Sequence, residues 1–93
     1  MTTWDNTDIT TIDRNTHGKL KERIYTIAGI SGDTGGTLTV TGFSNIKFAD
    51  VHAYQAAAQA PADVDFYISS NTIVVTYTDP TAAHTVIIQV IGY

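Results

Sequence analysis

The stretch His84-Thr-Val-Ile-Ile-Gln-Val-Ile-Gly-Tyr93 decides the fold, because it reads as a β-strand with apolar side chains on both faces. Strand side chains alternate with a period of two, so Val86, Ile88 and Val90 should share one side. Ile87 and Ile91, which flank Gln89, should lie on the other. A chain of 93 residues can cover only one of these faces well. We therefore expect another copy or a partner to cover the second face, with Ile87, Ile91 and Tyr93 as subunit-interface candidates.

The rest of the chain is also predicted to be all-β. Short runs rich in Thr, Val, Ile, Phe and Tyr are separated by Gly, Asn, Asp and Pro, a pattern typical of strands joined by turns. The expected strands cover residues 20–28, 37–41, 46–55, 64–69, 72–78 and 84–91. Ser70-Asn71 indicates a tight hairpin, and Asp79-Pro80 indicates a further turn. The last three strands should therefore form an antiparallel meander.

The region 46–59 allows two interpretations. Its apolar positions and the run Ala56-Ala57-Ala58 also fit a short helix that would end at Pro61, and alanine has a high helix propensity. A strand followed by an alanine-rich loop is preferred, and a helix over residues 48–60 stays open as the alternative.

Residues 1–16 are polar, rich in threonine and without clear periodicity. The large apolar residues of this segment are Trp4, Ile9 and Ile12, so it is interpreted as an extended N-terminal arm. A tryptophan is unfavourable in water, so Trp4 should either fold back on its own sheet or dock on a neighbour. The predicted organisation is an arm over residues 1–16 and a single β domain over 17–93, built as a small antiparallel β-sandwich or β-barrel.

Composition excludes several classes of function. The chain has no cysteine, which removes disulfides, thiolate chemistry and cysteine-bound metal. Its net charge of −4 argues against nucleic acid as a partner, because phosphate binding needs a basic surface. The start of the chain lacks the features of a signal peptide. No apolar run approaches the roughly 20 residues that span a bilayer, so we expect synthesis in the cytoplasm and no membrane partner.

The charges are unevenly distributed along the chain. Residues 14–23 contain four basic residues against one acid: Arg14, Lys19, Lys21 and Arg23 against Glu22. Residues 48–93 contain no Lys or Arg but four aspartates: Asp50, Asp63, Asp65 and Asp79. An ordinary solvated strand is the preferred interpretation, since segregation on this scale is common. A head-to-tail contact between copies, or docking on an acidic partner, is the alternative.

Catalytic and metal-binding patterns are weak, and no catalytic residue, metal site or cofactor is predicted. His17, His52 and His84 are not at metal-ligand spacing from one another. Asp50, His52 and Tyr54 would share one strand face, where structural hydrogen bonding is the preferred role. Asp63 and Asp65 would also share a face, but the glycine and the later glutamate of an EF-hand loop are missing.

An aromatic platform is the alternative binding site. Trp4, Tyr54, Tyr67 and Tyr77 could stack on sugars if they lay together on one exposed face, as in a carbohydrate- or receptor-binding module of a phage tail or host-surface protein. Scattered aromatic residues in a sandwich more often belong to the core or to interfaces.

The order of elements resembles small virion proteins of tailed bacteriophages. A polar start is followed by the basic segment His17-Gly-Lys-Leu-Lys-Glu-Arg-Ile-Tyr-Thr-Ile27, a Gly-rich loop and Thr37-Leu-Thr-Val-Thr-Gly-Phe43. A strand from Ile46 to Tyr54 and the closing Val86-Ile-Ile-Gln-Val-Ile-Gly92 complete the pattern. The chain is most similar in this respect to capsid decoration, or cement, proteins, and the similarity covers most of the sequence from Gly18 onward.

This resemblance implies a non-enzymatic β protein on the outer surface of a phage head. Such proteins often assemble as trimers and pin neighbouring major capsid protein subunits through N-terminal arms. By analogy, the capsid-contact candidates are the arm residues and the basic strand: Trp4, Ile9, Ile12, Arg14, Lys19, Lys21 and Arg23. The expected partners are further copies of the chain and the major capsid protein.

Overall fold

The computed structural model describes residues 2–5, 7–29, 34–54, 64–78 and 84–93. The strands in this part of the chain are β1 (Thr2–Trp4), β2 (Ile9–His17), β3 (Leu20–Gly29), β4 (Gly35–Thr39), β5 (Ile46–Tyr54), β6 (Asp65–Ser69), β7 (Thr72–Thr76) and β8 (His84–Gly92). These residues contain no helix, so the all-β prediction is confirmed. The strands form two separate sheets, which is the arrangement of a sandwich rather than a closed barrel.

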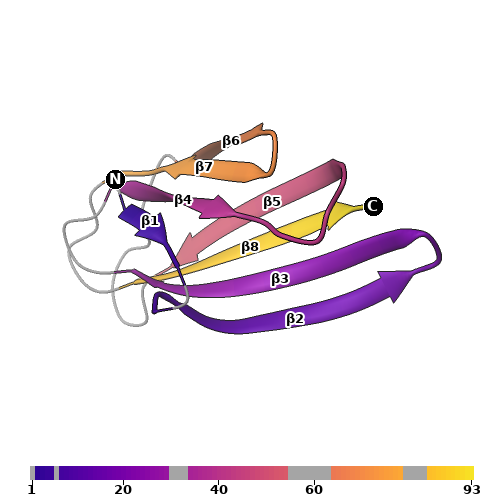
Figure 1. Cartoon of the computed structure of the whole chain (residues 1–93). Helices are drawn as coiled ribbons and strands as arrows, with labels where there is room; N and C mark the ends of the chain where they lie inside the picture. The colour runs from indigo at the N-terminus through magenta and orange to yellow at the C-terminus, as the bar shows by residue number, and fades with distance from the viewer. Residues whose placement is uncertain (1, 6, 30–33, 55–63, 79–83) are drawn as a thin grey trace.

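The two sheets differ in length. The short sheet has the order β1-β4-β7-β6, and its strands have three to five residues. The long sheet has the order β2-β3-β8-β5, with strands of nine or ten residues. The sheets lie one above the other, and the β2–β3 hairpin reaches beyond the short sheet (Figure 1). Part of the inner side of this hairpin is therefore not covered by any of the described strands.

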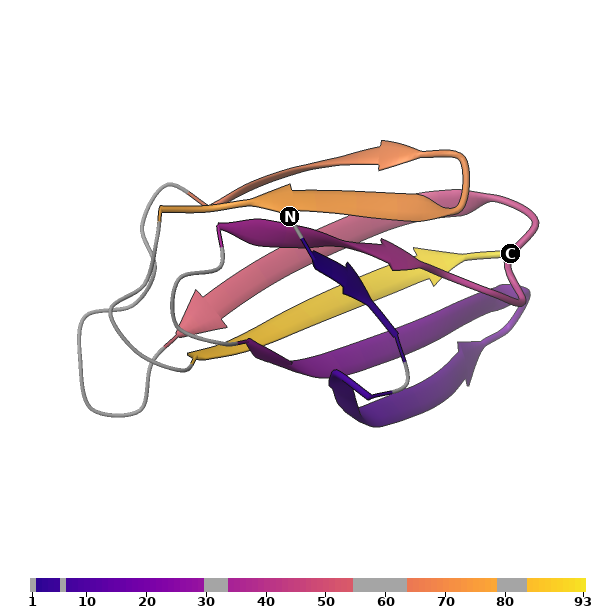
Figure 2. The same ribbon diagram turned by 60° about the vertical axis from the view of Figure 1, so that its left-hand side comes forward.

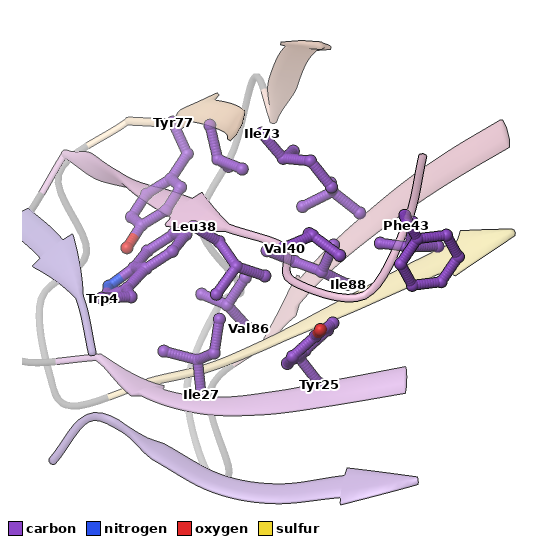
Figure 3. Packing of buried hydrophobic residues seen from close by; sticks show 13 residues of the cluster. Trp4, Tyr25, Ile27, Leu38, Val40, Phe43, Ile73, Tyr77, Val86 and Ile88 are labelled. Atoms are coloured by element: carbon purple, nitrogen blue, oxygen red, sulfur yellow. The ribbon is translucent and has the colours of Figure 1, made fainter. Parts of the chain in front are cut away.

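The core fills the space between the sheets. The long sheet contributes β-branched residues of β8 together with Tyr25 and Ile27, and the short sheet contributes Leu38, Ile73 and Val75. Trp4, Leu38 and Tyr77 gather at one end of this core, and Phe43 lies at the other (Figure 3). Phe43 belongs to the segment that crosses from β4 to β5 and closes the core at that end.

Strand β8 lies inside the long sheet, between β3 and β5. Its burial alternates residue by residue, and Val86, Ile88 and Val90 are fully buried. The predicted division of this strand into two faces is confirmed. The predicted meander is wrong, however: β6 and β7 form the expected hairpin through the two-residue turn Ser70-Asn71, but the chain then passes to the other sheet. A strand that is apolar on both faces is best buried in a central position.

The prediction of an extended N-terminal arm is wrong. β1 pairs in parallel with β4, and β2 pairs antiparallel with β3. Trp4 is only 3% exposed, so it folds back on its own sheet. A compact turn joins the two strands, because the backbone N–H groups of Asp8 and Ile9 both donate to the carbonyl oxygen of Asp5 at 3.0 Å.

The remaining predictions concern residues 46–59, the Asp79-Pro80 turn and Asp63. Residues 46–54 form strand β5, which confirms the strand over this range. The alanine-rich stretch after Tyr54 and the Asp79-Pro80 turn lie outside the described residues, as does Asp63.

Candidate interaction surfaces

The outer face of the long sheet is a broad surface that points away from the core (Figure 2). Cross-strand pairing places on it Thr11, Asp13 and Asn15 of β2, Glu22, Ile24 and Thr26 of β3, Ile87, Gln89 and Ile91 of β8, and Phe48, Asp50 and His52 of β5. Residues directly opposite one another in an antiparallel pair share a face. We call this set the outer face.

The centre of the outer face is apolar. Ile24, Ile87 and Ile91 are half-buried. Phe48, which lies opposite Ile91, is 49% exposed. Full burial of an isoleucine or phenylalanine side chain contributes about 1.5–3 kcal/mol. A partner that covered this centre would therefore gain a substantial part of that free energy.

Polar groups on the outer face are organised by hydrogen bonds. Glu22 accepts from the side-chain amide of Asn15 at 3.1 Å and from that of Gln89 at 2.6 Å. On β5, the imidazole Nε2 of His52 lies 2.9 Å from a carboxylate oxygen of Asp50. Glu22 and Asp50 give the face a negative character, to which Asp13 adds, and none of the outer-face residues is a lysine or arginine.

The structure places the three subunit-interface candidates at or beside this face. Ile87 and Ile91 point outward from β8 and stay partly exposed. Tyr93 follows the strand, is 42% exposed, and has the Lys47 ammonium 5.5 Å from its ring centroid. These positions suit an interface.

Basic residues occupy the opposite side of the same sheet, at the end of the β2–β3 hairpin. Arg14 lies directly opposite Arg23. The Arg23 guanidinium donates to the carbonyl oxygen of Thr41 and lies 5.1 Å from the ring centroid of Phe43. The Lys21 ammonium donates to the carbonyl oxygen of Gly42 at 2.9 Å. Arg23 and Lys21 thus hold the segment that crosses between the sheets.

Two open clefts meet at Arg14 and Arg23. The first, of about 230 Å³, lies between β2 and the short sheet, and its lining combines Trp4, Ile12 and Tyr25 with the two arginines. The second, of about 220 Å³, is formed by the hairpin itself and includes Lys19 and Lys21. Each cleft also includes one acidic residue, Asp5 in the first and Glu22 in the second, but basic residues outnumber it in both, which suits an acidic partner better than a basic one.

The capsid-contact candidates divide into two groups. Trp4 is buried in the protein's own core, and Ile9 and Ile12 are partly buried against it, so these three residues do not lie on a free arm. They anchor β1 and β2, because an apolar side chain is more stable in the core than in water. The basic candidates stay near the surface: Arg14, Lys19 and Lys21 are exposed, and Arg23 is half-buried.

The aromatic platform is not assembled. Trp4 and Tyr77 are core residues, whereas Tyr54 and Tyr67 are 46% and 61% exposed and lie on different sheets. Because the four rings do not share a face, stacking on a sugar by this set is disfavoured.

His52 and His84 do not form a shared site either. His52 is on the open outer face, and His84 is buried against Tyr77, whose hydroxyl lies 2.5 Å from its Nε2. Neither lines the two clefts. Within the described ranges, no group of three or more His, Cys, Asp or Glu residues is arranged to hold a metal ion.

Sequence reasoning missed the opposite charge on the two sides of the long sheet. The signal was present in the predicted strand 20–28, where Lys21 and Arg23 alternate with Glu22 and Ile24. Alternation alone places Lys21 and Arg23 on one face and Glu22 and Ile24 on the other. Assigning Asp13 and Arg14 to these faces also required β2 to be recognised as a strand.

No protein-family model matches the chain, and no curated protein or solved structure is significantly similar to it. In the part of the chain that is described, no helix is long and apolar enough to cross a membrane. Functional conclusions therefore depend on the surfaces themselves.

Proposed function

We propose that this chain is a non-enzymatic structural protein of a bacteriophage virion, of the capsid decoration or cement kind, that works by burying surface against its neighbours. The observation that carries the proposal is the apolar centre of the outer face. Ile24, Ile87, Ile91 and Phe48 lie together on a sheet surface that the rest of the described chain leaves open. Exposed apolar residues that cluster in this way are a feature of protein–protein interaction sites.

The mechanism would be additive. Each copy would bury its outer face in a homo-oligomer, a trimer by analogy with decoration proteins, and the oligomer would attach to the major capsid protein on the head surface. Symmetry repeats the same contact at every copy, so a modest gain per contact would stabilise the whole head. The protein would be made in the host cytoplasm and would reside in the virion.

Trp4, Ile9 and Ile12 support the chain's own core in this proposal rather than reaching to a capsid. In this proposal, the copies therefore associate through the outer face. This differs from the arm-based attachment that the resemblance implies.

The test measures mass and attachment together. Light scattering of the purified chain at micromolar concentration should give an oligomer, and the chain should sediment with heads assembled from the major capsid protein of the same genome. The double substitution Ile87→Lys and Ile91→Lys should lose both properties. The matched control places two lysines on the outer side of the short sheet, at Tyr67 and Val74, and should keep both.

A wild-type chain that stays a 10 kDa monomer and does not sediment with heads would contradict the proposal. So would a control pair that disrupts association as strongly as the outer-face pair, because the effect would then follow from added charge alone.

A further inference from the structure

The long sheet presents opposite charges on its two sides. The outer face contains Asp13, Glu22 and Asp50. The inner side of the hairpin, beyond the short sheet, contains the neighbouring Arg14 and Arg23. We call the exposed cationic end of the hairpin, formed by Arg14, Lys19 and Lys21, the basic hairpin. Four of the chain's five basic residues lie between positions 14 and 23, so this segregation involves most of its positive charge.

Face-to-face pairing of two outer faces is electrostatically unfavourable. A twofold contact uses the same patch on both subunits, so it would bring two sets of Asp13, Glu22 and Asp50 together. Like charges juxtaposed in an interface oppose association. The partner that suits this face is apolar and basic.

The basic hairpin has cationic groups available for such a contact. Arg14 and Lys19 are exposed, and neither side chain makes a hydrogen bond or ion pair with any described residue. Arg14 also lies opposite Arg23, and like charges directly opposite one another destabilise a strand pair. A carboxylate from outside would relieve this repulsion. Long basic side chains also cover apolar surface with their aliphatic stems.

We propose that the partner of the outer face is the basic hairpin of a second copy, in a head-to-tail contact that sets Arg14 and Lys19 of one copy against Asp13 and Asp50 of the next. Ile87 and Ile91 would be covered in the same contact. This inference rests on the proposed self-association through the outer face and specifies the partner. A contact between two different patches is heterologous, so it closes into a ring or continues as a filament.

The test reverses one charge at a time. R14E should weaken association at low salt by about tenfold or more, as expected for loss of a close charge pair across an interface. The variant should still fold, because it replaces the like-charge pair of Arg14 and Arg23 with an opposite-charge pair. K47E makes the same change in net charge but lies outside the basic hairpin, so it should weaken association far less than R14E does. D50K should weaken it, and D65K, on the short sheet, should not.

Mixing gives the decisive measurement. R14E keeps a native outer face, and D50K keeps a native basic hairpin, so the two weakened variants together should form a mixed complex that neither forms alone. Sedimentation velocity of each variant and of the equimolar mixture reports this directly. D13K is a second acid-side variant, because the Asp13 carboxylate makes no hydrogen bond to a described residue. Added salt should weaken the wild-type complex, because it screens exposed charges.

The outcomes separate the two proposals. A wild-type monomer would overturn the proposed function itself. A wild-type oligomer that R14E leaves intact, or a mixture that forms no complex, would overturn the head-to-tail contact alone and leave association through the outer face standing. Equal weakening by R14E and K47E would show that only net charge matters and would also overturn it.

Discussion

Trp4 lies opposite Leu38 in the parallel pairing of β1 with β4, and both side chains are almost completely buried. The contact joins two segments 34 positions apart in the sequence. It turns the first residues of the chain into an edge strand of the short sheet. The N-terminal segment is therefore part of the fold, and its removal should affect stability before it affects binding.

The first prediction concerns Trp4. Replacement by alanine should lower the free energy of unfolding by about 3–5 kcal/mol, because it removes a large aromatic side chain from the core and leaves a cavity. Urea denaturation measures the change. Thr3→Ala, at the adjacent exposed position, is the control and should change stability by about 0.5 kcal/mol or less. Equal effects of the two substitutions would mean that β1 does not pack as described.

The strands from β3 onward could be predicted because their alternation is local. Val86, Ile88 and Val90 show their common face in the sequence alone, and the structure buries all three. β2 was not predicted, because the register of its pairing with β3 shifts between Ile9 and Thr11. A bulge adds one residue to a strand, so Ile9 and Ile12 reach the same core although their spacing of three does not fit a period of two.

The sheet in which each strand lies could not be predicted. β7 and β8 follow one another in the sequence, yet they belong to different sheets. β1 has only three residues and becomes a strand through its pairing with β4. Such long-range pairings depend on the whole fold. The outer face was therefore foreseen only through Ile87 and Ile91, while its acidic residues on β2, β3 and β5 became visible when the sheet was assembled.

The second prediction separates the two faces of β8. Ile87→Lys should give a folded protein with weakened association, because this side chain points outward. Ile88→Lys should prevent folding, because it would place an ammonium group among fully buried core residues. Circular dichroism and light scattering distinguish these outcomes. Unfolding by both substitutions, or by neither, would contradict the described orientation of the strand.

The third prediction concerns the close approach of Gly29 and His84, which lie opposite one another in β3 and β8. A Cβ at position 29 would lie 2.2 Å from Nε2 of His84, and that ring is in edge contact with Tyr77. Gly29→Ala should therefore destabilise the protein by about 1–3 kcal/mol through overpacking.

A double-mutant cycle isolates this clash. In the His84→Ala background the added methyl group has room, so Gly29→Ala should be much less destabilising there than in the wild type. Neighbouring residues that share a contact are not additive. Strict additivity in thermal or urea unfolding would show that the imidazole ring is not the obstacle.

The fourth prediction concerns the turn between β1 and β2 and its dependence on pH. The Thr7 hydroxyl donates to Oδ1 of Asp5 at 2.6 Å, and the Thr7 backbone N–H donates to the same oxygen at 2.8 Å. These bonds favour the charged carboxylate, so they lower the pKa of Asp5 below its usual value. Thr7→Val removes the hydroxyl donor and should raise the pKa of Asp5, as measured by NMR titration of its carboxyl carbon.

The sign of the stability effect follows from this lowered pKa. A carboxyl whose pKa is lower in the folded state contributes stability above its unfolded pKa, and the contribution is lost as the pH falls through the folded value. Asp5→Asn should therefore be less stable than the wild type at neutral pH, and the difference should shrink in acid. Thr10→Val is the matched control for Thr7→Val, because the Thr10 hydroxyl donates instead to the carbonyl oxygen of Thr26. An Asp5 titration that moves equally in both threonine variants would mean that the Thr7 hydroxyl does not stabilise the charged carboxylate.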